Sequence, residues 1–370
     1  MPKDIPHVAF HLSGFYGGGA ERVMVNLTQS FVKRGIKVDL LVNAITGPYL
    51  PDVPLEARVI ETSKNERKSL SKLMHYLRQE QPQAMLACLH YCAELAILAK
   101  RFTLVPTRVV VAEQNHLSVR AQRAISKRDR LVPLAARLCY PWADGIVTVS
   151  QGVAEDLART TGLPLERIQV IFNPVIAPEI SEKAKEGVDH PWFAQGEPPV
   201  ILGVGRLEPQ KDFPTLIRAF AQVRQVCPAR LMILGSGNEL LQLKTLIGEL
   251  GLEKDVELPG FVKNPYAYIA HAATFVLSSA WEGLPTVLIE AMAVGTPVVA
   301  TACPSGPSEI LDNGKYGALV PVGDDKAIAE AILSILSGNS KSVDPNWINQ
   351  FTIETATQRY LEVMGLSQTV

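Results

Sequence analysis

Short β-rich runs alternate with amphipathic segments along this 370-residue chain, and the alternation stops once and then restarts. Such a pattern is typical of α/β proteins with parallel sheets. In the first half, residues 7–13 predict a strand and residues 20–34 a helix that Gly35 ends. The segment 176–198 is polar, rich in Pro and Glu, and without periodicity, so we expect a linker there. The sequence therefore predicts two doubly wound, Rossmann-like domains.

The overall composition agrees with a two-domain globular protein of the cytoplasm. A chain of 370 residues exceeds what one core usually fills, and 47% apolar with 20% charged residues is typical of a soluble fold. The net charge of −1 provides no global field that would attract nucleic acid. Five cysteines without metal-ligand spacing favour a reducing compartment, and no apolar run predicts a signal peptide or a membrane span. We expect a cytoplasmic protein.

Three loops that follow strands carry the candidate binding residues, because ligands of such sheets bind at the carboxyl ends of strands. The first loop contains Gly17, Gly18 and Gly19 and leads into a helix. Glycines allow close backbone approach, and the N–H groups of a helix start attract phosphate. A tight turn without a ligand remains the alternative, and the loop lacks the GxGxxG dinucleotide fingerprint.

The second loop, "GVGRLEPQKDFP", places Arg206 and Lys211 between a strand and a helix that we expect to begin at Pro214, with Asp212 near its cap. Two cations at this position can hold a diphosphate without a metal, Arg by its planar fork and Lys as a point charge. A solvated surface pair is the alternative.

The third loop opens "SSAWEGLPTVLIEAMAVGTPVVAT" (278–301), an apolar run with two carboxylates. We expect Pro285 to be the first residue of a helix, which places Glu282 in the loop and Glu290 in the second turn. Because eight helical residues rotate roughly 80° out of alignment, the two carboxylates do not form an acid/base pair on one face. They are expected to contact different parts of one long ligand. Alternatively, Glu282 caps the helix and Glu290 is solvated.

Taken together, "GRLEPQKDFPTLIRAF" and the 278–301 run resemble the retaining nucleotide-sugar glycosyltransferases of family 4, which have the GT-B fold of two Rossmann-like domains across a cleft. The segments "GGGAERVMVNL", "GPSEIL" and "GKYGALVPVGD" are similar to the same family. The resemblance implies an acceptor-side domain over 1–175, a donor-binding domain over 199–349, and a C-terminal helix, about 350–370, that packs back on the first domain.

The resemblance also implies the role of each site residue. Arg206 and Lys211 would hold the donor diphosphate, Glu282 the transferred sugar and Glu290 the ribose, and the Gly17–Gly19 loop would face the donor phosphates. His116 stands where many members have a histidine near the donor sugar, although Glu113 or Asn115 is an alternative. The implied donor-binding set also includes Gly283, Leu284 and Pro285. No Asp-x-Asp pair is present to bridge a metal to phosphate, so we expect no metal and no cofactor.

Basic residues at helical spacing follow the third β-rich run of the first half. Pro133 is expected to divide this stretch into two helices. The basic residues predict contact with anionic lipid headgroups or a lipid-linked acceptor, with a solvated charged face as the alternative. The set comprises Arg120, Arg123, Lys127, Arg130 and Arg137, with Arg128 beside them.

The resemblance therefore implies a retaining transferase that moves a hexose or N-acetylhexosamine from a nucleotide-sugar, most simply a UDP-sugar, to a saccharide or lipid-linked acceptor. We expect this reaction in cell-surface polysaccharide synthesis, at the inner face of the plasma membrane. An epimerase of the same fold and a non-catalytic nucleotide-sugar-binding partner are the alternatives from other classes. A dehydrogenase is disfavoured, because neither Gly-rich loop has the full dinucleotide fingerprint.

Overall fold

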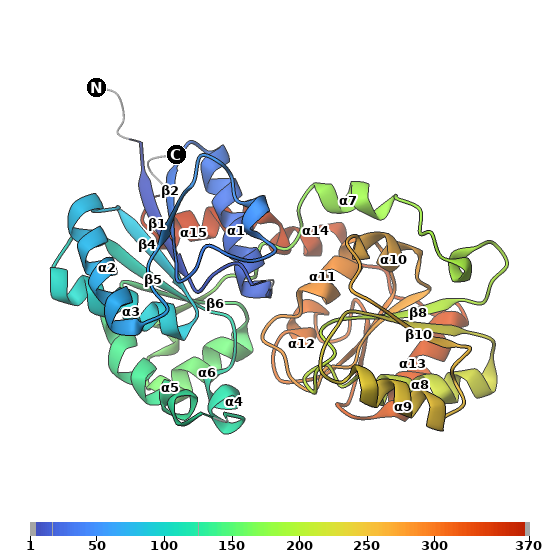
Figure 1. The fold of residues 1–370 in the computed structure, drawn as a ribbon. Helices are drawn as coiled ribbons and strands as arrows, with labels where there is room; N and C mark the ends of the chain where they lie inside the picture. Colours follow the sequence, from blue (N-terminus) through green and yellow to red (C-terminus); the bar gives the residue numbers. More distant parts are fainter. Residues whose placement is uncertain (1–4, 17, 125, 367–370) are drawn as a thin grey trace. The chain divides into compact units, whose positions relative to one another are not determined.

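The computed structural model describes residues 5–16, 18–124 and 126–366 (Figure 1). The chain forms two compact units. One unit runs to Pro174 and takes up the chain again at Phe351, and the other is the continuous stretch Val175–Gln350.

The first unit is built on a seven-stranded parallel sheet with the order β3-β2-β1-β4-β5-β6-β7. Its central strands are buried on both faces, which is why β4 is a continuous apolar run. The order reverses between β1 and β4, so the loops after these two strands flank the topological switch point. The strands are β1 (His7–Leu12), β2 (Lys37–Val42), β3 (Arg58–Glu61), β4 (Ala84–Cys88), β5 (Arg108–Glu113), β6 (Gly145–Thr148) and β7 (Ile168–Val170).

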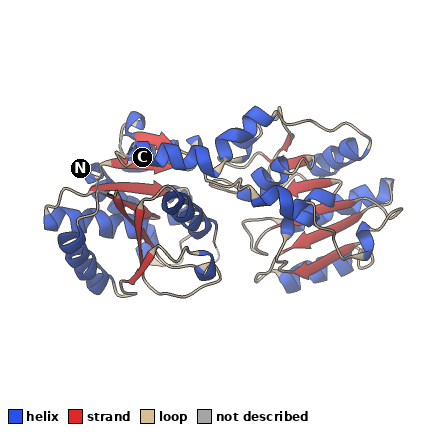
Figure 2. Cartoon of the chain, turned by 90° about the horizontal axis from the view of Figure 1, so that it is seen from above, coloured by secondary structure: helices blue, strands red, loops and turns tan. Residues whose placement is uncertain are grey.

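Helices cover both faces of this sheet (Figure 2). Val8, Phe10 and Leu12 of β1 pack in the core beneath α1 and α15, whereas Ala9 faces the core beneath α2, α3, α5 and α6. This alternation follows from the two-residue period of a strand. The helices are α1 (Gly19–Lys33), α2 (Glu66–Glu80), α3 (His90–Thr103), α4 (Leu117–Gln122), α5 (Lys127–Cys139), α6 (Gln151–Thr161) and α15 (Ile353–Val363), with short 3₁₀ turns η1 (Leu50–Asp52), η2 (Tyr140–Trp142) and η3 (Leu165–Arg167).

Helix α15 belongs to the core of the first unit, although it follows the whole second unit in the chain. Its residues Tyr360, Leu361 and Val363 are buried in the same core as α1. Arg108 at the start of β5 donates to the Val363 carbonyl at 2.7 Å. The last helix therefore completes the first unit.

The second unit has a six-stranded parallel sheet with the order β10-β9-β8-β11-β12-β13, which reverses between β8 and β11. One face is packed against α8, α9 and α13, and the other carries α10 and α11. The strands are β8 (Val200–Val204), β9 (Arg230–Leu234), β10 (Val256–Gly260), β11 (Thr274–Leu277), β12 (Val298–Thr301) and β13 (Ala318–Val320). The helices are α7 (Glu179–Ala184), α8 (Phe213–Val226), α9 (Leu240–Glu249), α10 (Pro265–His271), α11 (Thr286–Ala293), α12 (Pro307–Ile310), α13 (Asp325–Leu336) and α14 (Pro345–Ile348), with 3₁₀ turns η4 (Pro191–Phe193) and η5 (Asn349–Phe351).

The predicted class, α/β with two Rossmann-like parallel sheets, is confirmed. The segment 176–198, suggested as a linker by its composition, contains α7 and η4, and α7 packs against α10 of the second unit. Within the described part of the chain, no helix has both the length and the apolarity needed to cross a bilayer.

Three local expectations differ from the structure. Helix α8 begins at Phe213 instead of Pro214, and α11 begins at Thr286 because ψ of Pro285 is 97°, outside the helical range. The division expected at Pro133 is wrong: α5 runs through this proline. The chain breaks earlier, where Ser126 caps α5 by accepting from Asp129 N at 3.0 Å. Burial of Val132 and Ala136 on either side of the proline offsets the helix bond that the proline removes.

Candidate functional site

The loops after β8 and β11 flank the switch point of the second sheet and bring Lys211 and Glu282 together. Lys211 Nζ lies 2.5 Å from Glu282 Oε1, with the two side chains only 14% and 7% exposed. Ser279 Oγ donates to the same carboxylate oxygen at 2.7 Å, and Gln210 Nε2 donates to Oε2 at 3.2 Å. The carboxylate is therefore held from three sides. Its position is fixed by tertiary contacts, and it does not cap α11.

The backbone of the two loops is joined around this pair. Ala280 N donates to the Gln210 carbonyl at 2.9 Å, and Ser278 Oγ donates to the Lys211 carbonyl at 2.7 Å. A Cβ at Gly205 would lie 3.2 Å from the Lys211 side chain, so the lysine packs closely over this glycine. A larger residue at position 205 would displace the cation.

Ser305 and Gly306 support the Glu282 loop from the segment after β12. Ser305 Oγ donates to the carbonyls of Glu282 and Gly283 at 3.1 and 3.0 Å. Gly306 has φ +77°, and a Cβ there would lie 2.6 Å from Pro285 Cδ. Only glycine fits this conformation and this approach. The quoted motif "GPSEIL" begins at Gly306, but the sequence did not assign Gly306, Ser305, Gln210 or Ser279 to the site. The partners of Gly306, Ser305 and Gln210 are distant in sequence, whereas Ser279 lies only three residues before its partner Glu282 and was overlooked.

Arg206 and Glu290, also predicted for the donor site, are more exposed than the buried pair. Arg206 has a 67% exposed side chain and pairs with Glu208 at 3.0 Å. Glu290 is half-buried in the second turn of α11, while Glu282 precedes the helix, so the two carboxylates occupy different elements as expected. Gly283, Leu284 and Pro285 are buried between them.

In the first unit, Gly18 is the N-cap residue of α1 and Gly19 its first residue, whereas Gly17 lies outside the described residues. A Cβ at Gly19 would meet nothing within 4 Å, so the helix start has open space beside it. Another glycine, Gly47, packs against this loop, and the sequence did not indicate it. Gly47 has φ +132°, and a Cβ there would lie 2.0 Å from the Phe15 carbonyl oxygen, so only glycine allows the contact. The glycine loop is therefore anchored to the segment after β2.

His116 precedes α4 and is oriented by a buried carboxylate. Its Nδ1 lies 3.8 Å from Asp156 Oδ1 on α6, and the His116 side chain is 10% exposed. Burial opposes ionisation of Asp156, but hydrogen bonds from His116 and Ser118 hold its pKa below the usual range. The imidazole thus has a fixed anionic neighbour.

The alternative residues near His116 differ in accessibility. Asn115 is exposed, whereas Glu113 is buried at the end of β5 and accepts a hydrogen bond from Tyr140. Burial raises the pKa of Glu113 to about 8, so this carboxyl is mainly protonated at neutral pH. A buried neutral acid is not placed to contact a sugar, so His116 and Asn115 remain the candidates in that loop.

A cavity of about 580 Å³ lies at the switch point of the first sheet, between the loops after β1 and β4. Lys64, Arg120 and Arg128 contribute cationic groups to its lining, and Asp129 contributes a carboxylate. Arg120 Nη2 pairs with Asp129 Oδ1 at 2.9 Å. Burial lowers the pKa of His90, which also lines the cavity, to about 4, so its imidazole is neutral at pH 7. The cavity therefore has a net cationic lining.

The predicted basic residues do not form one helical stripe, because α4 ends at Gln122 and α5 begins at Lys127. Arg120 lies on α4 and lines the cavity, and the exposed Arg123 is the C-cap residue of α4. Arg130 lies on α5 and donates to the Ala124 carbonyl at 3.3 Å. The side chain of Lys127 lies outside the described part.

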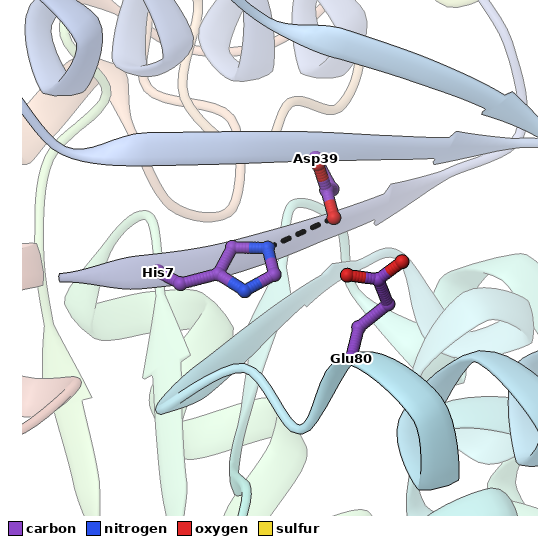
Figure 3. A group of neighbouring side chains, drawn as sticks. All are labelled: His7, Asp39 and Glu80. Atoms are coloured by element: carbon purple, nitrogen blue, oxygen red, sulfur yellow. Dashed lines mark hydrogen bonds and ion pairs between the residues drawn. The ribbon is translucent and has the colours of Figure 1, made fainter. Parts of the chain in front are cut away.

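Across the described ranges, one group of side chains has the spacing of metal ligands: His7, Asp39 and Glu80 (Figure 3). His7 Nε2 lies 2.8 Å from Asp39 Oδ2, and Arg58 Nη2 lies 2.5 Å from the same oxygen and 3.0 Å from Glu80 Oε1. A guanidinium therefore already occupies the position between the carboxylates. Although burial opposes ionisation, hydrogen bonds from His7 and Arg58 hold the pKa of Asp39 below its usual range. This group is an ion-pair network of the sheet.

The chain was compared with known protein families and with curated relatives. The model of Glycosyltransferase Family 4 matches residues 17–177, and the model of Glycosyl transferases group 1 matches residues 187–349. The lipopolysaccharide core biosynthesis glycosyltransferase LpsE of Rhizobium meliloti is 29% identical over 362 residues, which is 94% of this chain and 96% of LpsE. A Campylobacter jejuni enzyme, N-acetylgalactosamine-N,N'-diacetylbacillosaminyl-diphospho-undecaprenol 4-alpha-N-acetylgalactosaminyltransferase, is 35% identical over 199 residues, 54% of this chain and about half, 52%, of that enzyme.

Solved structures match the whole fold. HepE of Anabaena in complex with UDP and glucose has a TM-score of 0.76 at 20% identity, covering 97% of this chain and 99% of that one. The apo form of the lipopolysaccharide outer core galactosyltransferase WaaB has a TM-score of 0.74 at 21% identity, with coverage of 97% and 99%. The folds of these two solved structures and the two family models all indicate a glycosyltransferase. The chain thus combines a Glycosyltransferase Family 4 domain with a Glycosyl transferases group 1 domain, and its fold is that of the GT-B glycosyltransferases.

Proposed function

We propose that this chain is a retaining glycosyltransferase that moves a hexose or N-acetylhexosamine from a UDP-sugar to a saccharide or lipid-linked acceptor in the synthesis of lipopolysaccharide or another cell-surface polysaccharide. The carrying observation is the buried Lys211–Glu282 pair at the switch point of the second sheet. The names of LpsE and of the Campylobacter enzyme support the pathway and the lipid-linked acceptor, and the UDP complex of HepE supports the nucleotide.

Lys211 supplies the cation for the donor diphosphate in this proposal. The Lys211 ammonium keeps its pair with Glu282 and directs its remaining N–H groups to the diphosphate. The lone pairs of the Glu282 carboxylate that Lys211, Ser279 and Gln210 leave unused accept hydroxyls of the sugar. The exposed Arg206 adds a planar fork for phosphate from the same loop. Fixed cations in a partly desolvated site stabilise the charge that develops on the leaving phosphate. No metal and no cofactor are required.

The chemistry proposed is a front-face substitution. The bond between the sugar C1 and the phosphate oxygen breaks, a bond from the acceptor oxygen to C1 forms on the same face, and the acceptor proton passes to the leaving phosphate. Glu290 binds the ribose, the glycine loop at Gly18–Gly19 contributes backbone N–H groups towards the phosphates, and His116 contacts the donor sugar. The catalytic group in this assignment comprises Lys211, Arg206, Glu282 and His116.

The acceptor binds in the cavity of the first unit, where Lys64, Arg120 and Arg128 match an anionic group such as a lipid-linked diphosphate. We further propose a cytoplasmic enzyme that is peripheral on the inner face of the plasma membrane, with Arg123, Lys127 and Arg130 contributing attraction to anionic lipid.

The test begins with a thermal-shift comparison of UDP-, GDP- and ADP-sugars, since a ligand that binds only the folded state raises the melting temperature. The stabilising donor is then incubated in detergent with a lipid-linked saccharide, and the product is identified by mass spectrometry and its anomeric configuration by NMR. An isomerised sugar formed without acceptor would support the epimerase alternative instead. Donor binding without any turnover would support a non-catalytic partner.

A further inference from the structure

Helix α5 exposes a row of leucines on the surface of the first unit. Leu131, Leu134 and Leu138 are 59%, 54% and 62% exposed, and their spacing of three and four residues places them on one side of the helix. Val132 and Ala136 on the opposite side are buried in the core. The helix is therefore apolar on its outer side as well as on its inner side.

Exposed apolar side chains also lie on α3 and η2, the elements beside which α5 packs (α3 and α5 are labelled in Figure 1). Trp142 of η2 lies four residues after Leu138 and is 51% exposed. At the end of α3, Phe102 and Leu104 are 57% and 80% exposed. A hollow of about 490 Å³ lies between these elements, lined by Leu104 and Trp142 among others. Several exposed apolar side chains on elements that pack together are typical of an interaction site.

Arginines border the leucine row on both sides. At about 100° per residue, Arg128 falls on one side of the leucines, and Arg130 and Arg137 fall on the other. All three are exposed. Beyond the helix, the guanidinium of Arg101 lies 5.7 Å from the centre of the Trp142 ring.

The nearby carboxylates are neutralised within the unit. Asp129 pairs with Arg120, and Asp144 accepts a hydrogen bond from Lys100. The border of the apolar surface is thus cationic, which complements an anionic partner.

We propose that the α5 face, defined as Leu131, Leu134, Leu138, Trp142 and the arginines that border them, docks on a bilayer containing anionic lipid. Helix α5 then lies in the plane of the interface, with its leucines among the acyl chains and Trp142 at headgroup level. Arg130 and Arg137 extend to lipid phosphates while their methylene stems cover apolar surface. Arg128, whose guanidinium lies 4.9 Å from the centre of the Tyr91 ring, stays at the acceptor cavity. The proposal rests on the membrane association stated under the proposed function. It adds insertion of apolar side chains to charge attraction as a second source of membrane binding.

The α5 face also connects the membrane to the acceptor cavity. Ser126, Arg128 and Asp129 at the start of the same helix line that cavity. With α5 in the interface, the cavity faces the headgroup layer. An acceptor with a lipid tail then reaches the cavity without leaving the membrane.

Vesicle flotation without any nucleotide-sugar tests the proposal. The wild type is expected to bind vesicles of phosphatidylcholine with phosphatidylglycerol, and to retain part of this binding at high salt, since apolar insertion is not screened. The double variant Leu134→Gln/Leu138→Gln is expected to lose at least about tenfold in partitioning at high salt. The variant Arg130→Gln/Arg137→Gln should weaken binding only at low salt.

Matched controls separate docking from folding and from the transferase reaction. Leu241, 78% exposed on α9 of the second unit, provides the control Leu241→Gln, which should bind as the wild type does. In the wild type, vesicles should shift the tryptophan emission to the blue, and the shift should vanish in Trp142→Phe. Equal vesicle binding by wild type and leucine variant overturns the proposal. The proposal is also overturned if the wild type binds no vesicles but forms a dimer that the Leu134→Gln/Leu138→Gln variant dissociates, because the α5 face would then be a contact between two copies of the chain. Transfer in detergent is scored separately, so the proposed function stands or falls independently.

Discussion

Lys211 Nζ and Glu282 Oε1 lie 2.5 Å apart although 71 residues separate them in the chain. The loops after β8 and β11 carry one residue each, and Glu282 has two further donors in Ser279 and Gln210. Removing either partner leaves a poorly exposed charge without its counterion, which is costly. Kinetic effects of substitutions here must therefore be separated from effects on stability.

Lys211→Ala is expected to lower kcat/KM by a factor of about 10² to 10³, equivalent to roughly 2 to 4 kcal/mol of transition-state stabilisation. The physical reason is that the charge on the leaving diphosphate loses its nearest fixed cation. Steady-state kinetics with the identified donor measure the effect, and Lys244→Ala on the exposed face of α9 is the matched control. Activity within a few-fold of wild type, with an unchanged melting temperature, would remove Lys211 from the phosphate site.

Glu282→Gln should lower kcat more than it raises the donor KM, and Glu290→Gln should do the reverse. Contacts to a reacting sugar can strengthen in the transition state, whereas contacts to a remote ribose mainly supply binding. Competition by the free nucleoside diphosphate, which contains the ribose but no sugar, gives a second measurement: its affinity should fall only in the Glu290 variant. Equal losses of turnover with unchanged nucleotide affinity would instead indicate a shared structural role.

Transfer activity is expected to survive EDTA. Lys211 and Arg206 provide cationic charge in the loop proposed to bind the diphosphate, and in the part of the chain that the structure describes the only ligand-like group, His7 with Asp39 and Glu80, is occupied by Arg58. The measurement compares initial rates with chelator and with added magnesium. Complete loss that magnesium restores would show that the phosphate clamp includes a metal.

Glu113→Gln should flatten the pH dependence of stability between about pH 5 and 8. Because burial raises the pKa of Glu113 to about 8 in the folded chain, the folded state keeps a proton there that the unfolded state loses near its ordinary pKa. The stability contribution is therefore fully present at acid pH and is lost as pH rises towards 8. Denaturant titrations of wild type and variant at several pH values measure the difference. Parallel pH profiles of the two proteins would contradict the raised pKa.

The sequence predicted the elements with local causes. The strand predicted over residues 7–13, observed as β1, and the helix stop at Gly35, which has φ +75°, are set by neighbouring residues and were predicted correctly. Likewise, the loops after β8 and β11 were recognised from motifs that contain their own turn and helix-start residues. The separation of Glu282 and Glu290 onto loop and helix followed from the helix start expected at Pro285, one residue before the observed start at Thr286.

The remaining features depend on contacts between segments that are distant in sequence. Neither motif by itself indicates that Lys211 and Glu282 pair, or that Gly47 must admit the Phe15 carbonyl. Pro133 was misread because core packing of its neighbours outweighs the local preference of a proline. The leucine row of α5 was missed because an apolar residue in a sequence gives no indication of whether it is buried.

The placement of α15 sets an order in which the chain can fold during synthesis. All contacts of the stretch Val175–Gln350 become available as soon as that stretch has left the ribosome, so the second unit can fold before the chain is complete. The first unit, although synthesised earlier, lacks Tyr360 and Leu361 from its core until residues 353–363 emerge. Its apolar surface beneath α15 is therefore open for the whole time that the second unit is being made, and the unit that starts the chain is the last to close.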